Sequence, residues 1–337
     1  MKLLSIVIPC YNSQDYMEHC IQTLLKGKDE VEILIVNDGS TDRTAEIADQ
    51  YAKKYPTIVK TIHQKNTGHG GAVNTGLKNA TGIFFKVVDS DDWVNFKSYQ
   101  EVLTTLHQII LNQDKLDMLL CNFVYENKHV KRKKIMHYRK IFPTNQIFTW
   151  KDLKSFPTGY YILMHSIIYR TQFLKSFNFA LPKHTFYVDN LFVYYPLPHV
   201  KNMYYLDTNF YRYYIGRDDQ SVHEVNMIKR IDQQIYITKL AINAFDISKL
   251  SPKYLRKCAH QHLEILMAIT SSLLLRSGTK ENLEKKRALW RYLKRNQRKI
   301  YRKIRYGFLG VGCNWPGKAG RTLSVKIYQL VRRVYGC

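Results

Sequence analysis

The stretch Asp89-Ser90-Asp91-Asp92 follows an apolar run over residues 83–88 and carries the clearest chemical signal in this sequence. A strand that ends in clustered carboxylates delivers them to the crevice where open α/β sheets bind ligands. Two aspartates separated by one residue offer hard oxygen ligands for Mn²⁺ or Mg²⁺, which commonly also hold the phosphates of a substrate. A surface turn of the same composition is the alternative, and the residues upstream decide between the two.

The residues before this stretch alternate short apolar strands with helices. We expect strands at residues 4–8, 31–36 and 57–63 and a fourth beginning at Gly82, with Ser13 as the N-cap of the first helix. Strands separated by helices of roughly ten residues form βαβ units in a mostly parallel sheet. The sequence therefore predicts an α/β, Rossmann-like fold.

Polar residues follow three of these strands, in the stretches Pro9-Cys10-Tyr11-Asn12, Asn37-Asp38-Gly39 and Asp89-Ser90-Asp91. The C-termini of parallel strands meet at one edge of a sheet, so we expect these side chains to converge there. Tyr11 offers a ring for a base, and Asp38 offers an acceptor for a base N–H or a ribose hydroxyl. Asp89 and Asp91 offer oxygens for a ribose and a metal ion.

This order of motifs resembles the family 2 glycosyltransferases, inverting enzymes of the GT-A fold that use nucleotide-diphosphate sugars. The resemblance covers roughly residues 3–110, through Ser5-Ile6-Val7-Ile8-Pro9-Cys10-Tyr11-Asn12, Val36-Asn37-Asp38-Gly39-Ser40-Thr41-Asp42, Asn66-Thr67-Gly68, Asn74-Thr75-Gly76-Leu77 and Asp89-Ser90-Asp91-Asp92. It implies Asp91 as the metal ligand, and it implies donor contacts from Pro9, Tyr11, Asn12, Asp38, Asn66, Gly68, Asp89 and Ser90.

One departure from the family pattern lies in the loop after Asn66. The family often has Ala-Ala-Arg-Asn where this chain has Gly71-Ala72-Val73-Asn74, so the arginine is missing. Arg217 lies in a later stretch that resembles a family Arg-x-x-x-Ser segment close to the donor diphosphate. The resemblance implies Arg217 as the replacement cation, and a solvated loop arginine is the alternative.

Asp189 is our candidate for the catalytic base. Inversion at an anomeric carbon requires the acceptor hydroxyl to lose its proton as it attacks, and a nearby carboxylate accepts that proton. Asp189 stands among aromatic and apolar residues, where desolvation raises the pKa of a carboxyl group. The family usually has Glu-Asp here, with the Asp as base, and this chain has Val188-Asp189. The alternative is that Asp189 only caps a helix starting at Asn190, and the two roles are compatible.

The net charge of +25 is unevenly spread along the 337 residues. Residues 1–110 hold 11 Lys/Arg against 13 Asp/Glu, a balance of −2, whereas residues 280–337 hold 17 against 2, a balance of +15. Residues 128–140 form a second basic run, for which a charged hairpin or loop with a solvated face is the default interpretation. His165 and His184 are expected to be structural or to lie on the acceptor side.

The C-terminal third is predicted to be helical, with helices over residues 228–244, 253–275 and 281–304. Basic amphipathic helices of this kind suit an anionic membrane surface. The alternatives are that their apolar stripes pack on the rest of the protein, or that the charge binds nucleic acid. No nucleic-acid module is visible in the sequence, so we expect no nucleic-acid partner.

We expect a GT-A catalytic domain over residues 1–222, with a nucleotide-sugar half (1–110) and an acceptor half (111–222), followed by a basic helical region (223–337). Six scattered cysteines and the lack of a membrane-spanning stretch predict a reduced, cytoplasmic chain at the inner face of the membrane.

The predicted function is metal-dependent, inverting transfer of a sugar to a hydroxyl of a glycan or lipid-linked glycan in cell-surface polysaccharide synthesis. Family habit implies a UDP-linked sugar. A nucleotidyltransferase is disfavoured because residues 9–12 are not a glycine-rich phosphate loop. A non-catalytic basic scaffold that binds membrane or polyanion, with a vestigial sugar-nucleotide site, is the remaining alternative.

Overall fold

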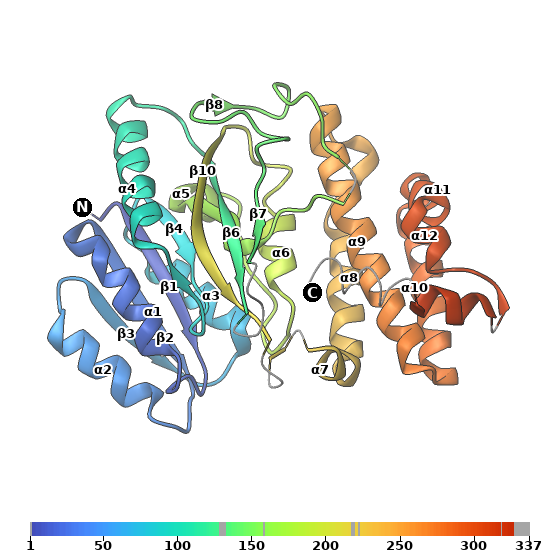
Figure 1. Ribbon diagram of the computed structural model, residues 1–337, viewed down its shortest axis with the longest axis horizontal. Coiled ribbons are helices and arrows are strands. Elements are labelled where there is room, and N and C mark those ends of the chain that lie inside the picture. Colours follow the sequence, from blue (N-terminus) through green and yellow to red (C-terminus); the bar gives the residue numbers. More distant parts are fainter. Residues whose placement is uncertain are drawn as a thin grey trace. The chain divides into compact units, whose positions relative to one another are not determined.

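Two compact units divide the chain (Figure 1). The computed structural model describes residues 2–127, 133–157, 159–216, 220–221, 223–317 and 319–326. The sheet unit consists of Met1–Lys154 with Ile162–Ile215, and the helical unit of Ser155–Tyr161 with Gly216–Cys337. Our domain boundary at residue 222 and the division at residue 110 stay predictions, because compactness does not test which segments fold alone.

The sheet unit is built around one ten-stranded sheet among the described residues. In chain order its strands are β1 (Leu4–Cys10), β2 (Val31–Asp38), β3 (Val59–Gln64), β4 (Phe84–Val87), β5 (Trp93–Val94), β6 (Met118–Glu126), β7 (Lys134–Met136), β8 (Ile147–Phe148), β9 (Ile167–Arg170) and β10 (Met203–Tyr214). Across the sheet they lie in the order β3-β2-β1-β4-β9-β6-β10-β5, with β7 beside β6 and β8 beside β10.

The first four strands form the parallel half that the sequence predicts. β1 pairs in parallel with β2 and β4, and β2 pairs in parallel with β3. The second half is mixed, because β9 runs antiparallel to both β4 and β6 while β10 runs parallel to β6. The α/β fold is confirmed, and the C-terminal ends of β1, β2 and β4 meet at one edge.

Helices cover both faces of this sheet. They are α1 (Met17–Leu24), η1 (Leu25–Glu30), α2 (Thr44–Lys54), α3 (Gly68–Asn79), α4 (Phe96–Leu111), η2 (Met164–Ser166), α5 (Thr171–Lys175) and α6 (Asp189–Tyr194). Ile6 and Ile8 of β1 join a buried cluster with apolar residues of α1, α2 and α4. Because side chains alternate along a strand, Val7 points to the opposite face, where α3 packs.

Gly76 allows α3 to lie directly against β1. A Cβ atom at this position would collide with the Val7 side chain, so a residue without a side chain is required there. α3 begins at Gly68, whose N–H donates to Asp38 at the end of β2. The N-cap prediction for α1 is wrong, because α1 begins at Met17 after Tyr16, while the Ser13 hydroxyl lies 2.8 Å from Ser90 Oγ.

Part of the basic run at 128–140 lies in an antiparallel arm, as predicted for a hairpin. β7 pairs with β6, and Lys133 Nζ lies 2.6 Å from Glu126 Oε2 with 52% of the lysine side chain exposed. Residues 128–132 lie outside the described ranges.

The helical unit contains α7 (Glu224–Lys229), α8 (Ile231–Ala244), η3 (Ile247–Lys249), α9 (Lys253–Ser277), α10 (Lys280–Asn296), α11 (Arg298–Tyr306) and α12 (Phe308–Gly312). The predicted helix over 281–304 is instead two helices, α10 and α11, separated by Gln297. Gln297 has non-helical angles (φ −134°, ψ 56°), and its buried side chain donates to the Ile242 and Phe245 carbonyls at the end of α8. The last carbonyls of a helix have no N–H partner within that helix, and here the Gln297 side chain at the break donates the missing hydrogen bonds.

Within the described ranges, no helix combines the length and the apolar character needed to cross a membrane. The longest, α9, buries polar side chains such as Gln261, Glu264 and Thr270 inside the helical unit.

Candidate active site

The loops after β1, β2 and β4 are joined by side-chain hydrogen bonds at the predicted sheet edge. The Asn12 N–H donates to Ser40 Oγ at 3.0 Å, and the Thr41 N–H donates to Asn12 Oδ1 at 2.9 Å. Ser13 Oγ lies 2.8 Å from Ser90 Oγ, which links the first loop to the loop after β4. The three polar stretches are therefore brought together, as the sequence analysis expects.

Tyr11 and Pro9 contribute two different surfaces to this edge. The Tyr11 side chain is 54% exposed, which leaves its ring open to a planar ligand. Pro9 is buried within β1, opposite Val36 of β2, so it shapes the strand end rather than offering a polar group. Their contacts with a donor stay predictions.

Asp38 holds the N-terminus of α3. One carboxylate oxygen accepts from the Thr67 N–H at 2.8 Å and the other from the Gly68 N–H, also at 2.8 Å. Gln64 Nε2 donates to the same carboxylate at 2.6 Å, and Asp38 is only 2% exposed. A carboxylate at a helix N-terminus satisfies orphan N–H groups and complements the helix dipole. Asp38 thus shapes the loop of Gly68, and a direct bond from Asp38 to the donor stays a prediction.

Asn66 fixes the turn that follows Asp38. Its Nδ2 donates to the Asp38 carbonyl at 2.9 Å. Gly39 has a φ of 73°, and a Cβ there would lie 2.9 Å from the Asn66 backbone nitrogen. The turn therefore depends on a glycine for its left-handed backbone and for space.

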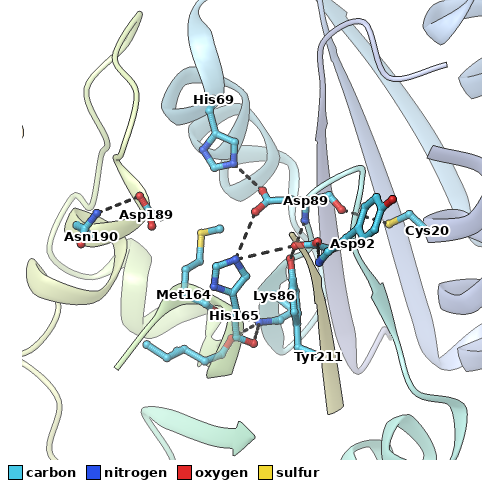
Figure 2. Close-up of polar contacts among 12 residues, drawn as sticks. Cys20, His69, Lys86, Asp89, Asp92, Met164, His165, Asp189, Asn190 and Tyr211 are labelled. Carbon is cyan, nitrogen blue, oxygen red and sulfur yellow. Dashed lines mark hydrogen bonds and ion pairs between the residues drawn. The ribbon is translucent and has the colours of Figure 1, made fainter. Parts of the chain in front are cut away.

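Asp89 forms the central ion pair of the site with His69, which lies in the first turn of α3 (Figure 2). His69 Nε2 lies 2.8 Å from Asp89 Oδ1, and 32% and 24% of the two side chains are exposed. Burial alone would raise the pKa of Asp89, but the neighbouring His69 holds it below its usual value. Burial would likewise lower the pKa of His69, and Asp89 raises it instead. Each group therefore favours the charged form of the other.

The pKa of Asp92 shifts in the opposite direction to that of Asp89, although the two residues are only three positions apart. Asp92 is 1% exposed, and its carboxyl oxygens accept from Tyr211 Oη at 2.5 Å and from the Tyr214 N–H at 2.7 Å. Burial, and then the charges of Asp91 and Asp89, raise its pKa well above the usual value. Asp92 therefore ties β10 to the loop after β4.

His165 and Lys86 lie beneath the aspartates (Figure 2). His165 Nε2 is 3.8 Å from Asp89 Oδ2 and 4.0 Å from Asp92 Oδ2, and burial lowers the pKa of His165 to about 4. Lys86 is completely buried on β4, and its Nζ donates to the carbonyls of Met164 at 3.0 Å, His165 at 2.7 Å and Ile167 at 3.1 Å. Lys86 therefore holds the segment that carries His165 against the aspartates.

The oxygen and nitrogen ligand atoms at this edge of the sheet fit a divalent cation. Among the described residues, Asp89, Asp92 and His165 each place a ligand atom within 4.8 Å of the others. Asp92 is the weakest ligand of the three, because its oxygens already accept two hydrogen bonds and its pKa is raised. Asp89, which is 24% exposed, and the half-buried Asp91 are less buried than Asp92. Asp91 lies outside the geometric cluster, and its role as metal ligand stays a prediction.

Asp189 is the first residue of α6, and its Oδ1 accepts from Asn190 Nδ2 at 3.2 Å. The N-cap position is Val188, so capping of a helix from Asn190 by Asp189 is not the arrangement found. Burial raises the pKa of Asp189, while the charge of His69 acts in the opposite direction. Figure 2 shows Asp189 facing the region of His69 and Asp89 from the α6 side.

α3 also holds the segment that leads to Asp189. Asn74 Nδ2 donates to the Leu181 carbonyl at 2.8 Å, and Asn74 Oδ1 accepts from the Leu181 N–H at 2.9 Å. The His184 N–H donates to the Thr67 carbonyl at 2.6 Å. One helix therefore positions both the predicted donor edge and the predicted base.

Comparison with known proteins agrees with this geometry. The family model for glycosyl transferase family 2 matches residues 5–173, about half of the 337-residue chain. The chain belongs to this family. It is 40% identical over 122 residues to the uncharacterized glycosyltransferase EpsJ of Bacillus subtilis (strain 168), a match that covers 36% of this chain and 34% of EpsJ. The chain thus spans about a third of the length of that curated relative.

Two solved structures share the fold of this family member. The structure of S. aureus TarS 1–349 in complex with UDP-GlcNAc has a TM-score of 0.65 at 19% identity, covering 98% of this chain and 92% of TarS. The mannosyltransferase PcManGT from Pyrobaculum calidifontis, in complex with GDP-Man and Mn²⁺, has a TM-score of 0.55 at 13% identity, covering 99% and 87%. The GT-A fold expected from the sequence is confirmed.

The sequence analysis does not single out His69, and it treats Lys86 only as part of an apolar run. It names His165 as structural or acceptor-side without placing it beside the aspartates. A lysine inside an apolar strand was a usable signal, because a buried lysine requires partners. Arg217, the predicted phosphate cation, lies outside the described residues.

Replacement of Lys86 by Met should destabilise the sheet unit. The three carbonyls that Lys86 serves would be left buried without their donor, at a cost of at least about 1–3 kcal/mol. The control is Lys97→Met, because Lys97 lies exposed in the first turn of α4, where a surface substitution changes the free energy of unfolding by about 0.5 kcal/mol or less. Urea unfolding measures both variants. Equal, small losses in the two would show that Lys86 does not hold the His165 segment.

Proposed function

We propose that this protein transfers a sugar from a nucleotide-diphosphate donor to a hydroxyl of an acceptor glycan, with inversion at the anomeric carbon. The observation that carries the proposal is that α3 and its N-cap are hydrogen-bonded both to the end of β2 and to the segment before Asp189. Asp38 binds the N-terminal N–H groups of α3, and Asn74 and Thr67 bind the segment before Asp189. A donor edge and a carboxylate base held by one helix suit a reaction in which both reactants must be aligned.

Asp189 would accept the proton of the attacking hydroxyl. Its raised pKa, caused by burial, brings its basicity closer to that of an effective general base at neutral pH. Asp89, held as a carboxylate by His69, would accept from hydroxyl groups of the ribose or the sugar. Tyr11 would stack on the base, and the loop containing Asn66 and Gly68 would line the donor site.

A divalent cation, Mn²⁺ or Mg²⁺, would be held by Asp91 with Asp89 beside it. When bound, such an ion offsets the charge on the departing diphosphate. The PcManGT complex contains Mn²⁺, and the TarS complex contains UDP-GlcNAc. PcManGT supports a metal ion and TarS a uridine nucleotide as the first choices for this chain, although the donor in the PcManGT complex is GDP-Man. Arg217 is proposed as a further cation at the diphosphate.

The proposed acceptor is a glycan or lipid-linked glycan in cell-surface polysaccharide synthesis. A match to the poly(ribitol-phosphate) beta-glucosyltransferase of Bacillus spizizenii, 41% identical over 95 residues, supports a cell-surface polymer as acceptor. That match covers 27% of this chain and 15% of the relative, so it supports the class of acceptor more than its identity.

We propose further that residues 280–337 bind an anionic membrane surface from the cytoplasmic side. The apolar stripes of α10 and α11 do not provide the contact, because Leu289, Leu293 and Ile304 are buried. The exposed ends of the helices do: Tyr306 is 71% exposed and Phe308 83% exposed, next to the basic residues of α11. Aromatic rings beside cations suit the interface of an anionic bilayer.

Two substitutions should separate donor binding from transfer. Asp91→Ala should abolish metal-dependent binding of the nucleotide sugar. Asp189→Asn should leave that binding intact and lower turnover by about 10²–10⁴-fold, because only the general base is lost. Calorimetric titration of the donor and a single-turnover transfer assay measure the two effects. Near-normal turnover of Asp189→Asn would contradict the assignment of the base.

Membrane binding should depend on the exposed aromatic residues of the helical unit. The double substitution Tyr306→Ser and Phe308→Ser should reduce flotation with vesicles that contain phosphatidylglycerol. Tyr236→Ser, a substitution of another exposed tyrosine (48% exposed) on α8, is the control and should float like the unsubstituted protein. Unchanged flotation of the double variant would remove these residues from the membrane proposal.

A further inference from the structure

A cavity of about 280 Å³ in the helical unit is lined by basic and aromatic side chains. Its lining residues are Lys286, Arg287, Trp290, Arg291, Lys294, Tyr301 and Asn314. They come from one face of α10, from α11 and from the turn after α12. Among the described residues, no carboxylate lines the cavity, and the sequence contains no Asp or Glu after Glu284. The cavity therefore has a positive potential with little internal compensation.

Lys286 is the least expected residue of this cavity. It lies in the buried stripe of α10 with Leu289, Trp290 and Leu293, and it is 9% exposed. Its Nζ donates to Asn314 Oδ1 at 2.8 Å, a neutral acceptor that offsets little of the charge. Burial, with the nearby Arg305 and Arg287, lowers the pKa of Lys286 to about 8. A structural role alone would favour an apolar residue here.

The aromatic side chains that line the cavity, Trp290 and Tyr301, are fixed by contacts within the helical unit. Trp290 Nε1 donates to Ser271 Oγ of α9 at 3.0 Å, which fixes the indole ring. Tyr301 meets it edge to face with 6.3 Å between ring centroids. The Arg305 guanidinium lies 5.9 Å from the Trp290 ring, and Lys294 Nζ lies 5.9 Å from the Tyr301 ring. Trp290 is only 6% exposed, so the half-buried Tyr301 is the more accessible ring. An aromatic ring with cations around it is suited to a ligand that is partly anionic and partly a polyol.

We propose that this cavity binds a phosphate ester, with Lys286, Arg287 and Arg291 contacting the phosphate and Tyr301, supported by Trp290, packing against the attached polyol or sugar. The cavity volume lies just below the usual range for small-molecule sites, so a single head group fits better than a long chain. The site is distinct from the glycosyl-transfer site and does not depend on the proposed activity. A lipid head group and the phosphate of a soluble acceptor are the two sources of this chemistry.

The test compares two double variants of the full chain that remove the same charge. Arg287→Gln with Arg291→Gln alters the cavity, while Arg295→Gln with Arg298→Gln alters exposed arginines that do not line it. Calorimetry at about 0.15 M salt measures binding of glycerol 3-phosphate, with glycerol as the uncharged comparison. Flotation measures binding to phosphatidylcholine vesicles with and without phosphatidylglycerol.

We expect the cavity variant to bind at least about tenfold more weakly and the control variant to change by about twofold or less. Selective loss with glycerol 3-phosphate identifies a soluble phosphate ester as a ligand, and selective loss with phosphatidylglycerol vesicles alone identifies a lipid head group. Equal losses in the two variants would show diffuse charge attraction and overturn the proposal. Absence of binding to both probes by the unsubstituted protein would overturn it as well.

Lys286→Met provides an independent check. If Lys286 serves ligand binding, Met should keep or raise the melting temperature, because a buried charge whose hydrogen-bond partner is the neutral Asn314 amide is replaced by an apolar chain of similar length. Phosphate-ester binding should fall at the same time. A lower melting temperature with unchanged binding would assign Lys286 a structural role and contradict the proposed site. Sugar transfer is not needed for any of these measurements, so their failure is distinguishable from failure of the proposed activity.

Discussion

The hydrogen bonds at the N-terminus and in the middle of α3 are the constraint on which the rest of the site depends. Asp38 accepts from two backbone N–H groups at the N-terminus of this helix, and Asn74 exchanges two hydrogen bonds with Leu181 further along it. Gly76 lets the helix lie against β1, so both sets of bonds are fixed relative to the sheet. The edge that holds Asp89 and the start of α6 at Asp189 are therefore positioned by one rigid element.

The pKa shift of each carboxyl group in the site depends on its surroundings. Asp89 remains ionised because His69 lies beside it, whereas burial and two like charges push the pKa of Asp92 upward. Lys86 sits below them, and burial lowers its pKa to about 7. Carboxylates this close cannot all be ionised without nearby cations. Asp89 and Asp91 are the less buried carboxyl groups of this turn, where a metal ion and a nucleotide would bring their own charges.

The positions of the first four strands and of the motifs along the chain could be predicted from the sequence because they depend on local patterns. Apolar runs with polar ends fix where β1, β2 and β4 stop, and the family resemblance covers that part of the chain. The positions of Lys86 and His165 could not be predicted, since their contact joins residues 79 apart in the chain. The break at Gln297 was missed for the same reason, because its side chain bonds to carbonyls 52 and 55 residues away. The apolar stripes of α10 and α11 show that periodicity predicts a buried face without identifying what covers it.

The most direct test of the central claim is thermal stability of the protein with a panel of nucleotides and nucleotide sugars, each with Mn²⁺ and with a chelator. A ligand at about 100 times its dissociation constant stabilises the folded state by roughly 2.7 kcal/mol, which a melting curve resolves. The account predicts a shift that requires both the metal and one nucleotide family, with uridine nucleotides first. No shift with any nucleotide would contradict a functional sugar-nucleotide site.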